Sequence, residues 1–407
     1  MSFTKRTVRD ISVGRKTVLV RADYNVPLKD GEISDDLRIR ASLPTIRYLL
    51  RQNARIVVIS HLGRPEGRDA SVSLEPIARR LGELLKKEVT FVEDCIGDKV
   101  KRAVKRAPLG SVTLLENLRF YKDEEANSEA FARKIAEATS ARYFVQDGFG
   151  VVHRAHASTA AITAFIPSVA GLLLKKEYHT ITTAMEKPRR PLIAVLGGAK
   201  VSDKIEVIEQ FVGIADKILI GGAMANTFLA YKGHNMGASI REKNLDTTLD
   251  RIYTASHKKI EGSVEDFIIL PSDVAVAKQP DADAKRRNVG LDKIASDDKA
   301  LDIGDTSIER FTQELKGAKT VVWNGTLGFA ELAPFAHGSA RVALALATQP
   351  DTDSIIGGGD TADFVLKWDG EANGKSFTHV STGGGASLDL MSGKLLPGVE
   401  CLLDAPK

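Results

Sequence analysis

Four clusters of glycine in the second half of this sequence each follow a short run of residues typical of a buried strand. Glycine at the carboxyl end of a parallel strand lets an anion approach the backbone, and the N–H groups of a following helix favour negative charge. One such cluster alone would predict only a tight turn. The four together, with a lysine and an aspartate beside them, predict a phosphate-binding edge of a sheet. They are Gly197-Gly198, Gly221-Gly222, Gly357-Gly358-Gly359 and Gly383-Gly384-Gly385.

Charged and hydroxyl side chains follow two of these clusters. Lys200 and Lys204 are four residues apart, a spacing that places both on one face of a helix. Asp360 and Thr361 follow the triple glycine, where a carboxylate could hold Mg²⁺ and a hydroxyl could bind a phosphate. The alternative for Asp360 is an ordinary helix N-cap. Neither GxxxxGK[ST] nor GxGxxG occurs in the sequence, so a phosphate site must be assembled from several loops.

Basic and polar residues in the first half lie at the ends of candidate strands. Because these ends meet at one edge of a parallel sheet, they predict a site that binds carboxylate and phosphate groups, which match the guanidinium fork. Any single arginine is more often a solvated surface group. A histidine pair could also suggest a metal site, but no third ligand is near in sequence. The residues are Arg21, Asp23, Asn25, His61, Arg64, Arg119, His153, Arg154 and His156, with Arg38 at the start of a helical pattern.

Strand-like and helical patterns alternate along the whole chain. The apolar runs are continuous, as expected for strands buried on both sides. This alternation predicts an α/β protein with parallel sheets covered by helices on both faces. The predicted strands are 17–21, 55–60, 89–92, 112–115, 143–145, 192–196, 217–220, 267–270, 320–323, 354–356 and 378–380, and predicted helices include 36–51 and 73–87.

The length of 407 residues favours two domains over one. Two prolines and several charges interrupt the pattern at Glu186–Pro191, where we expect the boundary. The preceding stretch, Pro167–Met185, is a candidate connecting helix.

Charge is spread unevenly, with 29 Lys+Arg against 21 Asp+Glu in residues 1–170 and 28 against 32 in the remainder. A basic first half suits an anionic ligand, although solvated surface charge is the simpler explanation. Aromatic residues make up only 6% and are not interleaved with basic ones, which argues against nucleic acid as a partner.

No membrane span or secretory signal is expected. The longest apolar run, Ala336–Ala347, is broken by His337 and Arg341, and the N-terminus has no apolar core. Cys95 and Cys401 lack metal-ligand spacing, and a reducing, cytoplasmic compartment is the expectation, although a disulfide between them stays open.

Nine motifs together resemble phosphoglycerate kinases, in the order found in that family and over essentially the entire chain. They are RADYNVP, DDLRIRASLPTI, SHLGRP, LLENLRF, HRAHAST, VLGGAKVSDKI, WNGTLGFAE, GGGDT and FTHVSTGGGASLDL. The resemblance implies two Rossmann-like three-layer α/β/α domains joined by a hinge helix. The N-terminal domain (1–170 with 390–407) would bind 3-phosphoglycerate or 1,3-bisphosphoglycerate. The segment 171–190 would link it to a C-terminal domain (191–389) binding MgATP or MgADP. A monomer is also implied.

The resemblance further implies roles for individual residues. The acid-binding positions are Asp23, Asn25, Arg38, His61, Arg64, Arg119 and Arg154, and a wider basic patch is formed by Arg21, His153 and His156. The nucleotide-binding positions are Lys200, Lys204, Gly222, Leu301, Asn324, Glu331, Gly357, Gly358, Gly359, Asp360 and Thr361, with Asp360 as metal ligand. Gly383 and Gly384 match a loop that supports the transferring group.

Four segments depart from the family pattern. The chain reads GGAMA at Gly221–Ala225 followed by Asn226 in place of a frequent aromatic residue, has Thr326 in place of a proline, and reads DIGD at Asp302–Asp305. The segment before HRAH reads QDGFGVV. The changes on the nucleotide side touch the fit of the purine and leave the choice between ATP and GTP open.

The implied chemistry is direct in-line phosphoryl transfer in which cations and backbone N–H groups stabilise the migrating charge. Arg38, Lys200, Gly358 and Gly384 are the residues expected to act in that step, on closure of the hinge. Two alternatives stand against this: a dinucleotide-dependent dehydrogenase, disfavoured by the missing GxGxxG, and a catalytically inactive nucleotide-binding scaffold of the same fold.

Overall fold

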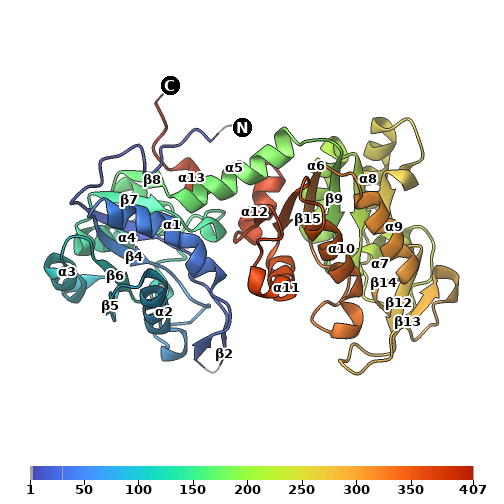
Figure 1. The fold of residues 1–407 in the computed structure, drawn as a ribbon, viewed down its shortest axis with the longest axis horizontal. Helices are drawn as coiled ribbons and strands as arrows, with labels where there is room; N and C mark the ends of the chain where they lie inside the picture. The colour runs from blue at the N-terminus through green and yellow to red at the C-terminus, as the bar shows by residue number, and fades with distance from the viewer. Residues whose placement is uncertain (1–2, 30, 407) are drawn as a thin grey trace. The chain divides into compact units, whose positions relative to one another are not determined.

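A computed structural model describes residues 3–29 and 31–406. The chain divides into two compact units, which we call the N-terminal unit (Met1–His179 with Leu395–Lys407) and the C-terminal unit (Thr180–Lys394). Each has its own six-stranded parallel sheet (Figure 1), and buried apolar residues pack against each sheet. This confirms the predicted fold class of two α/β parts with parallel sheets.

The N-terminal unit is built on a parallel sheet of six strands in the order β5-β6-β4-β1-β7-β8. In the middle of the sheet β1 pairs with β4 on one side and β7 on the other, so that Val18 of β1 lies opposite Ile56 and Tyr143. The strands are β1 (Thr17–Arg21), β4 (Arg55–Ile59), β5 (Val89–Val92), β6 (Val112–Leu115), β7 (Tyr143–Gln146) and β8 (Ser168–Ala170). A short hairpin, β2 (Leu28–Lys29) and β3 (Glu32–Ile33), follows β1.

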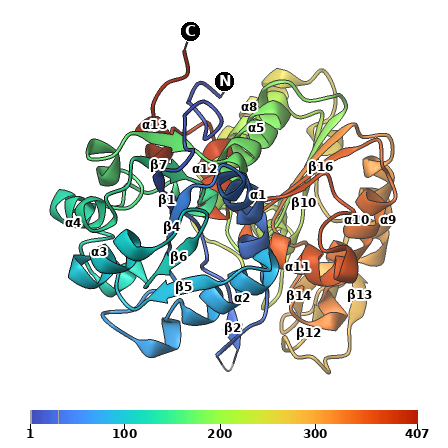
Figure 2. The ribbon, with the colours of Figure 1, turned by 60° about the vertical axis from the view of Figure 1, so that its left-hand side comes forward.

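Alternate residues of these strands enter two different cores, because successive side chains of a strand point to opposite faces. Val18 and Val20 belong to the core shared with α1 (Leu37–Arg51) and α2 (Glu75–Leu85). Leu19 belongs to the core shared with α3 (Gly97–Arg106) and α4 (Glu129–Thr139). The helices therefore cover both faces of the sheet, and the unit has three layers (Figure 2).

The C-terminal unit has a second parallel sheet of six strands, in the order β11-β10-β9-β15-β16-β17. Numbered within the unit, this order is that of the doubly wound nucleotide-binding fold, which binds ligands at the point where the strand order reverses. That point lies between β9 and β15. The strands are β9 (Leu192–Leu196), β10 (Lys217–Ile220), β11 (Ile268–Ile269), β15 (Thr320–Asn324), β16 (Asp353–Gly357) and β17 (His379–Val380).

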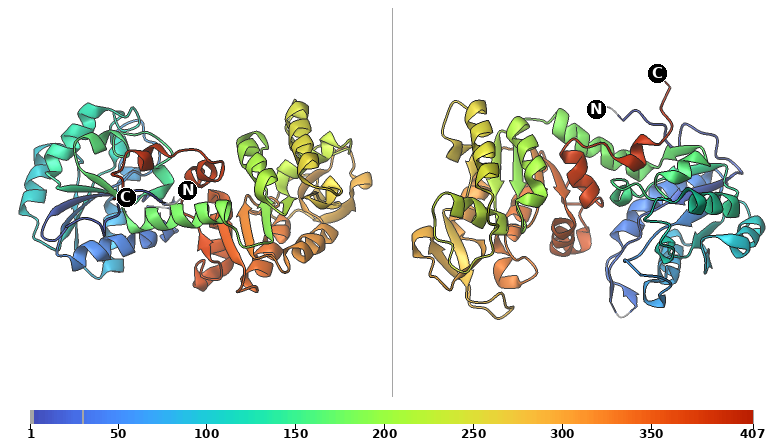
Figure 3. Two further views of the ribbon diagram at one scale, coloured as in Figure 1. Left: turned by 90° about the horizontal axis from the view of Figure 1, so that it is seen from above. Right: turned by 180° about the vertical axis from the view of Figure 1, so that it is seen from behind.

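Helices again pack on this sheet. One core joins its strands to α9 (Asp305–Leu315), α10 (His337–Ala347) and α11 (Gly359–Asp369). The remaining helices are α6 (Ile205–Ile214), which contacts both α8 (Asp246–Lys259) and α12 (Gly385–Met391), and α7 (Gly222–Tyr231). A separate antiparallel sheet, which the sequence did not lead us to expect, has the order β13-β12-β14 (Figure 3). Its strands are β12 (Asp273–Ala277), β13 (Arg287–Gly290) and β14 (Lys299–Ile303).

The connecting helix differs from its prediction at its start. Residues 168–170 form β8, an edge strand of the N-terminal sheet, and α5 begins only at Leu172 and ends at Glu186. The prediction that the helix starts at Pro167 was therefore wrong. The division between the units, after His179, falls within α5.

The C-terminal end of the chain belongs to the N-terminal unit from Leu395 onward. The N–H of Gly398, in α13 (Pro397–Glu400), donates to the carbonyl oxygen of Val152 at 2.9 Å, and Lys5 pairs with Asp404. The predicted segment began at residue 390, but α12 and the residues after it up to Lys394 stay with the C-terminal unit. No helix in residues 3–29 or 31–406 is long and apolar enough to cross a membrane.

Candidate active site

In the N-terminal unit, Arg38 is held at the carboxyl end of β1. Its side chain extends from the first turn of α1, and Nη1 lies 3.1 Å from Oδ2 of Asp23 and 3.1 Å from the carbonyl oxygen of Asn25. Asp23 is buried, whereas Arg38 keeps 28% of its side-chain surface exposed. The guanidinium is thus positioned by a buried carboxylate and still has N–H groups available for an anion.

Gly63 joins two more of the predicted residues. Its N–H donates to Oδ1 of Asn25 at 2.8 Å, and its carbonyl oxygen accepts from Nη1 of Arg119 at 2.6 Å. Gly63 follows β4, and Arg119 lies in the short helix η2 (Leu118–Phe120) that follows β6. The ends of neighbouring strands therefore place Asn25 and Arg119 on either side of one residue, Gly63.

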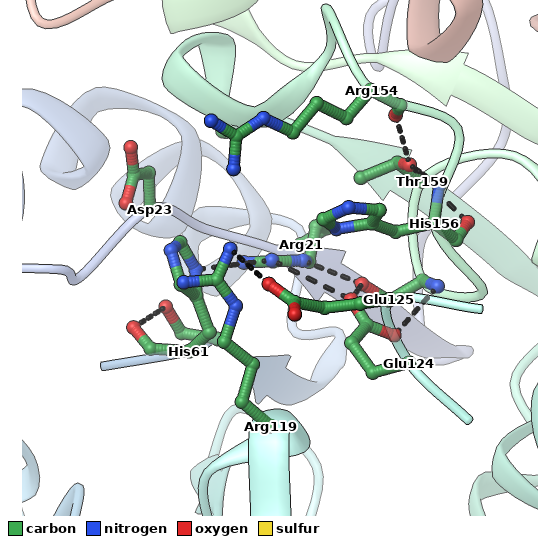
Figure 4. A network of polar contacts seen from close by, with 12 residues as sticks. Arg21, Asp23, His61, Arg119, Glu124, Glu125, Arg154, His156 and Thr159 are labelled. Carbon is green, nitrogen blue, oxygen red and sulfur yellow. Dashed lines mark hydrogen bonds and ion pairs between the residues drawn. The ribbon is translucent and has the colours of Figure 1, made fainter. Parts of the chain in front are cut away.

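Two further cations lie near Arg119. Burial is the main cause that lowers the pKa of Arg119, and the charges of the exposed Arg154 and Arg64 lower it further. Glu125 acts in the opposite direction, because its Oε1 lies 3.0 Å from Nη2 of Arg119. Figure 4 shows Arg119 and Arg154 together with Asp23 and His61. His153 is half-buried in the loop after β7. Among the described residues, the structure thus gathers the predicted acid-binding side chains at one edge of the sheet.

Arg21 differs from the rest of the predicted basic patch. Only 1% of its surface is exposed, and its guanidinium donates to Ser158, to the carbonyl oxygen of Ala22 and to His61. A group so enclosed cannot contact a substrate directly. His156 is also buried, and burial followed by the charge of Arg21 lowers its pKa to about 4.

In the C-terminal unit, Lys204 lies at the point where the strand order reverses. Its Nζ donates to the carbonyl oxygen of Gly197 at 2.7 Å and to that of Asn324 at 3.2 Å, the residues that follow β9 and end β15. Burial lowers the pKa of Lys204 to about 8, although Asp360 and Asp203 act in the opposite direction. Lys204 therefore binds the backbone of the site in addition to any phosphate.

Lys200 has a different environment from Lys204. It is exposed in the loop after β9, just before the short helix η5 (Ser202–Lys204), so the two lysines do not share a helical face as expected. Glu242 fixes this loop: Oε2 accepts from the backbone N–H of Val201 at 2.5 Å and of Ser202 at 3.0 Å. A loop held by Glu242 that carries an exposed ammonium group suits contact with a phosphate.

The triple glycine after β16 faces Asn324. A Cβ atom added to Gly357 would lie 3.1 Å from Nδ2 of Asn324, and one added to Gly358 would lie 3.3 Å from Oδ1. Nδ2 is buried and has no hydrogen-bond partner among the described residues. Buried donors are normally satisfied, so this amide indicates a bound acceptor at the glycine loop. Thr361, by contrast, is fully buried, and its hydroxyl accepts from the N–H of Gly325 at 2.7 Å.

Asp360 is exposed in the first turn of α11. No group of three or more metal-ligating side chains occurs in the part of the chain that the structure describes. One carboxylate beside a phosphate site fits the usual binding of Mg²⁺, which is held by one or two carboxylates plus the phosphates of a nucleotide. The residues present thus fit a metal that arrives with the nucleotide.

The residues predicted around adenine and ribose meet at the loop after β15. The N–H of Gly222 donates to the carbonyl oxygen of Leu327 at 2.8 Å, and the N–H of Phe329 donates to that of Leu301 at 2.7 Å. Glu331 is exposed further along the same loop. Gly383 and Gly384 follow β17, where the N–H of Gly383 donates to Ser381 Oγ at 3.0 Å.

Three of the four segments that depart from the family pattern make defined contacts in the structure. Asn226 is buried, and its Nδ2 donates to the carbonyl oxygen of Ile240 at 3.1 Å. Thr326 contributes its carbonyl oxygen, which accepts from the N–H of Gly198 at 2.9 Å. Asp305 is the first residue of α9, where a carboxylate suits the helix dipole, and it pairs with Arg286 at 3.0 Å.

Sequence reasoning missed two carboxylates at the site. Glu124, in YKDEEAN, is fully buried and accepts from Ser158, and Glu242, in IREKN, holds the loop of Lys200. Both lie in runs of charge that are usually solvated. No local signal distinguishes them, since their partners are 34 and 41 residues away in sequence.

The chain has two α/β units, each with a parallel sheet. One has a cationic sheet edge and the other has glycine-lined strand ends with lysines, which together define a class of enzymes that act on phosphate groups. The chain belongs to the phosphoglycerate kinase family: the model of that family matches residues 8–394. The phosphoglycerate kinases of Pelotomaculum thermopropionicum and Dictyoglomus turgidum are each 46% identical, and each comparison covers 99% of this chain and 100% of the relative. Solved structures agree. The enzyme from Coxiella burnetii has a TM-score of 0.83 at 35% identity, and that from Pyrococcus horikoshii has 0.82 at 33%, each covering 98% of both chains.

Proposed function

We propose that this chain catalyses reversible phosphoryl transfer between 1,3-bisphosphoglycerate and ADP, giving 3-phosphoglycerate and ATP, as a step of glycolysis and gluconeogenesis. The observation that carries the proposal is the division of charge between the units. The N-terminal unit gathers arginines at one sheet edge, and the C-terminal unit places Lys200 and Lys204 at the point where its strand order reverses.

The N-terminal site would bind the phosphorylated acid. Arginines make bidentate contacts with both carboxylate and phosphate groups, and Arg64, Arg119 and Arg154 supply three of them close together. Arg38 is oriented by the buried Asp23 and would act on the group in transit. Because the attacking oxygen of a carboxylate or phosphate is already ionised, no side-chain base is needed.

The C-terminal site would bind the nucleotide. The glycine loop after β16, Lys200 and Nδ2 of Asn324, which has no hydrogen-bond partner among the residues that the structure describes, offer donors for its phosphates. When bound, Mg²⁺ would neutralise phosphate charge, with Asp360 as its protein ligand. Backbone N–H groups at Gly358 and Gly384, with Lys200 and Arg38, would stabilise the charge that develops on the migrating group.

The two alternatives are weaker. The relatives and solved structures of this family are named as kinases, which argues against the alternative that this chain is a dehydrogenase. A catalytically inactive scaffold finds no support in the comparisons, and Arg38, Lys200 and Asp360 are all present. We also propose a monomer in the cytoplasm, consistent with the two unpaired cysteines, Cys95 and Cys401.

A coupled assay tests this function. With 3-phosphoglycerate and MgATP, the purified protein should form ADP and an acyl phosphate, and omission of Mg²⁺ should abolish turnover. The same assay with MgGTP would settle the purine preference. Absence of turnover with every nucleotide, in a protein that still binds MgATP, would favour the scaffold.

A further inference from the structure

A continuous chain of hydrogen bonds runs through the interior beneath the acid-binding residues. Oε1 of Glu124 accepts from the Ser158 hydroxyl at 2.5 Å, and Oε2 accepts from the Ser158 N–H at 3.0 Å. Ser158 Oγ in turn accepts from Nε of Arg21 at 2.8 Å. Nη2 of Arg21 lies 3.2 Å from Nδ1 of His61 and 3.8 Å from Oε1 of Glu124. Figure 4 labels Arg21, His61 and Glu124 of this network.

The positions of the protons follow from one fact: a guanidinium can only donate. Ser158 Oγ must accept from Arg21 and must therefore direct its own proton to Glu124. For the same reason, Nδ1 of His61 must accept, so it carries no proton. A histidine with an unprotonated Nδ1 is neutral, and its proton is on Nε2.

The other ring nitrogen of His61, Nε2, is not engaged by this network. Among the described residues, Nε2 has no hydrogen-bond partner, and it is not one of the fully enclosed polar atoms. The charged and titratable groups around this ring are Arg21 from β1, Arg38 from α1, Arg119 from η2 and His156 from the loop after β7. Burial disfavours a charged imidazole most, these four groups add to the effect, and together they lower the pKa of His61 well below its usual value.

We propose that Glu124 and Ser158 are positioning residues which, by orienting Arg21, hold His61 as the neutral tautomer with its Nε2 proton directed at the bound acid. His61 then donates a hydrogen bond to an oxygen of the substrate without changing its charge over the working range of pH. The identity of that substrate rests on the proposed function, whereas the tautomer does not.

The tautomer can be read directly from the full-length enzyme. We would label histidine with ¹⁵N and record long-range ¹H–¹⁵N correlation spectra, assigning the His61 signals by their loss in His61→Gln. The wild type should show an unprotonated Nδ1 and a protonated Nε2, unchanged between about pH 5 and pH 8. A protonated Nδ1, or titration of the ring in that range, would overturn the proposal. This reading needs neither turnover nor a variant of the network, so it stands if the enzyme proves inactive.

Two variants test the positioning roles. Ser158→Ala removes the hydroxyl between Glu124 and Arg21, and Glu124→Gln removes the charge while keeping the size. In both, the His61 ring should show mixed tautomers, and KM for 3-phosphoglycerate should rise by about tenfold with kcat changed far less, because a contact made equally in ground and transition states is weakened.

Glu137→Gln is the matched control, since it makes the same chemical change at an exposed position on α4. It should leave the His61 signals and KM as in the wild type. If both network variants fold and keep the wild-type His61 spectrum and KM, the two residues have no positioning role. If neither variant folds, the wild-type spectrum decides the question of the tautomer.

Discussion

The Nζ of Lys204 lies 2.7 Å from the carbonyl oxygen of Gly197, at the point where the C-terminal sheet reverses its strand order. The same nitrogen reaches the carbonyl oxygen of Asn324, so one side chain joins the ends of β9 and β15. Lys200, four residues earlier, is exposed. We therefore expect the two lysines of this motif to differ in their tasks: Lys204 supports the backbone of the site, and the exposed Lys200 contacts phosphate.

Methionine substitutions should separate these tasks. Lys204→Met leaves the carbonyl oxygen of Gly197 without its donor, and we expect the free energy of unfolding to fall by about 1–3 kcal/mol. Lys200→Met should leave stability within about 0.5 kcal/mol of the wild type and reduce kcat strongly. Chemical unfolding with steady-state kinetics on both variants checks this. Equal losses of stability would contradict the distinction.

Gly197 should tolerate no side chain. A Cβ atom there would lie 2.2 Å from the carbonyl oxygen of Thr326 and 2.7 Å from that of Gly325, both of them backbone atoms. Gly197→Ala should lower stability by about 1–3 kcal/mol and weaken nucleotide binding, as measured by unfolding and by titration with MgADP. Gly213→Ala, in α6, is the control: a Cβ there meets nothing within 4 Å, and a small gain in stability is expected.

The loop of Lys200 should depend on Glu242. Glu242→Ala removes the oxygen that accepts from the N–H groups of both Val201 and Ser202. We expect kcat to fall by about tenfold because Lys200 is less well placed, with little change in KM for the acid. Glu261→Ala, at an exposed position, should be neutral. Wild-type kcat in Glu242→Ala would show that the loop needs no such support.

Asp147 should make stability depend on pH. The carboxylate is buried; Oδ1 accepts from the N–H of Leu173 in α5, and Oδ2 has no partner among the residues described. Burial raises the pKa of Asp147 to about 7. The folded state therefore keeps a proton that the unfolded state releases, and this contribution to the free energy of unfolding falls as pH rises from about 4 to about 7.

Asp147→Asn cannot titrate and should lose this slope, so its stability relative to the wild type should increase over the same interval by up to a few kcal/mol. Unfolding curves recorded across that pH range measure the difference. The control is Asp123→Asn, where the carboxylate is exposed. Parallel pH profiles for the wild type and Asp147→Asn would show that Asp147 is ionised in the folded protein throughout.

Much of the fold could be predicted from local pattern. The strands 17–21 and 192–196 were placed to the residue, because strands buried on both faces read as continuous apolar runs. Residues 168–170 were assigned to a helix, since three residues are too few to show a period. Of the antiparallel strands, β13 and β14 were missed because charged and polar residues interrupt their apolar ones, as in Arg287–Gly290. The apolar run of β12, Asp273–Ala277, could have been recognised from its sequence.

The residues of the site could be predicted from the sequence, but their burial and their contacts with one another could not. Local sequence showed where Arg21, Lys200 and Lys204 lie along the chain, yet not which of them is buried. That depends on partners far away in sequence, such as Ser158 for Arg21 and Asn324 for Lys204. The buried carboxylates Glu124 and Glu242 escaped notice for the same reason.

We propose that Arg38 of the N-terminal unit and Lys200 of the C-terminal unit both stabilise the migrating phosphoryl group. The most direct test is the single-turnover rate of phosphoryl transfer, with both substrates saturating, in Arg38→Ala and in Lys200→Ala, alongside equilibrium binding of each substrate. We predict a rate about 10²–10³-fold lower in each variant, with dissociation constants changed far less. A near-normal rate of transfer in either variant would contradict the claim.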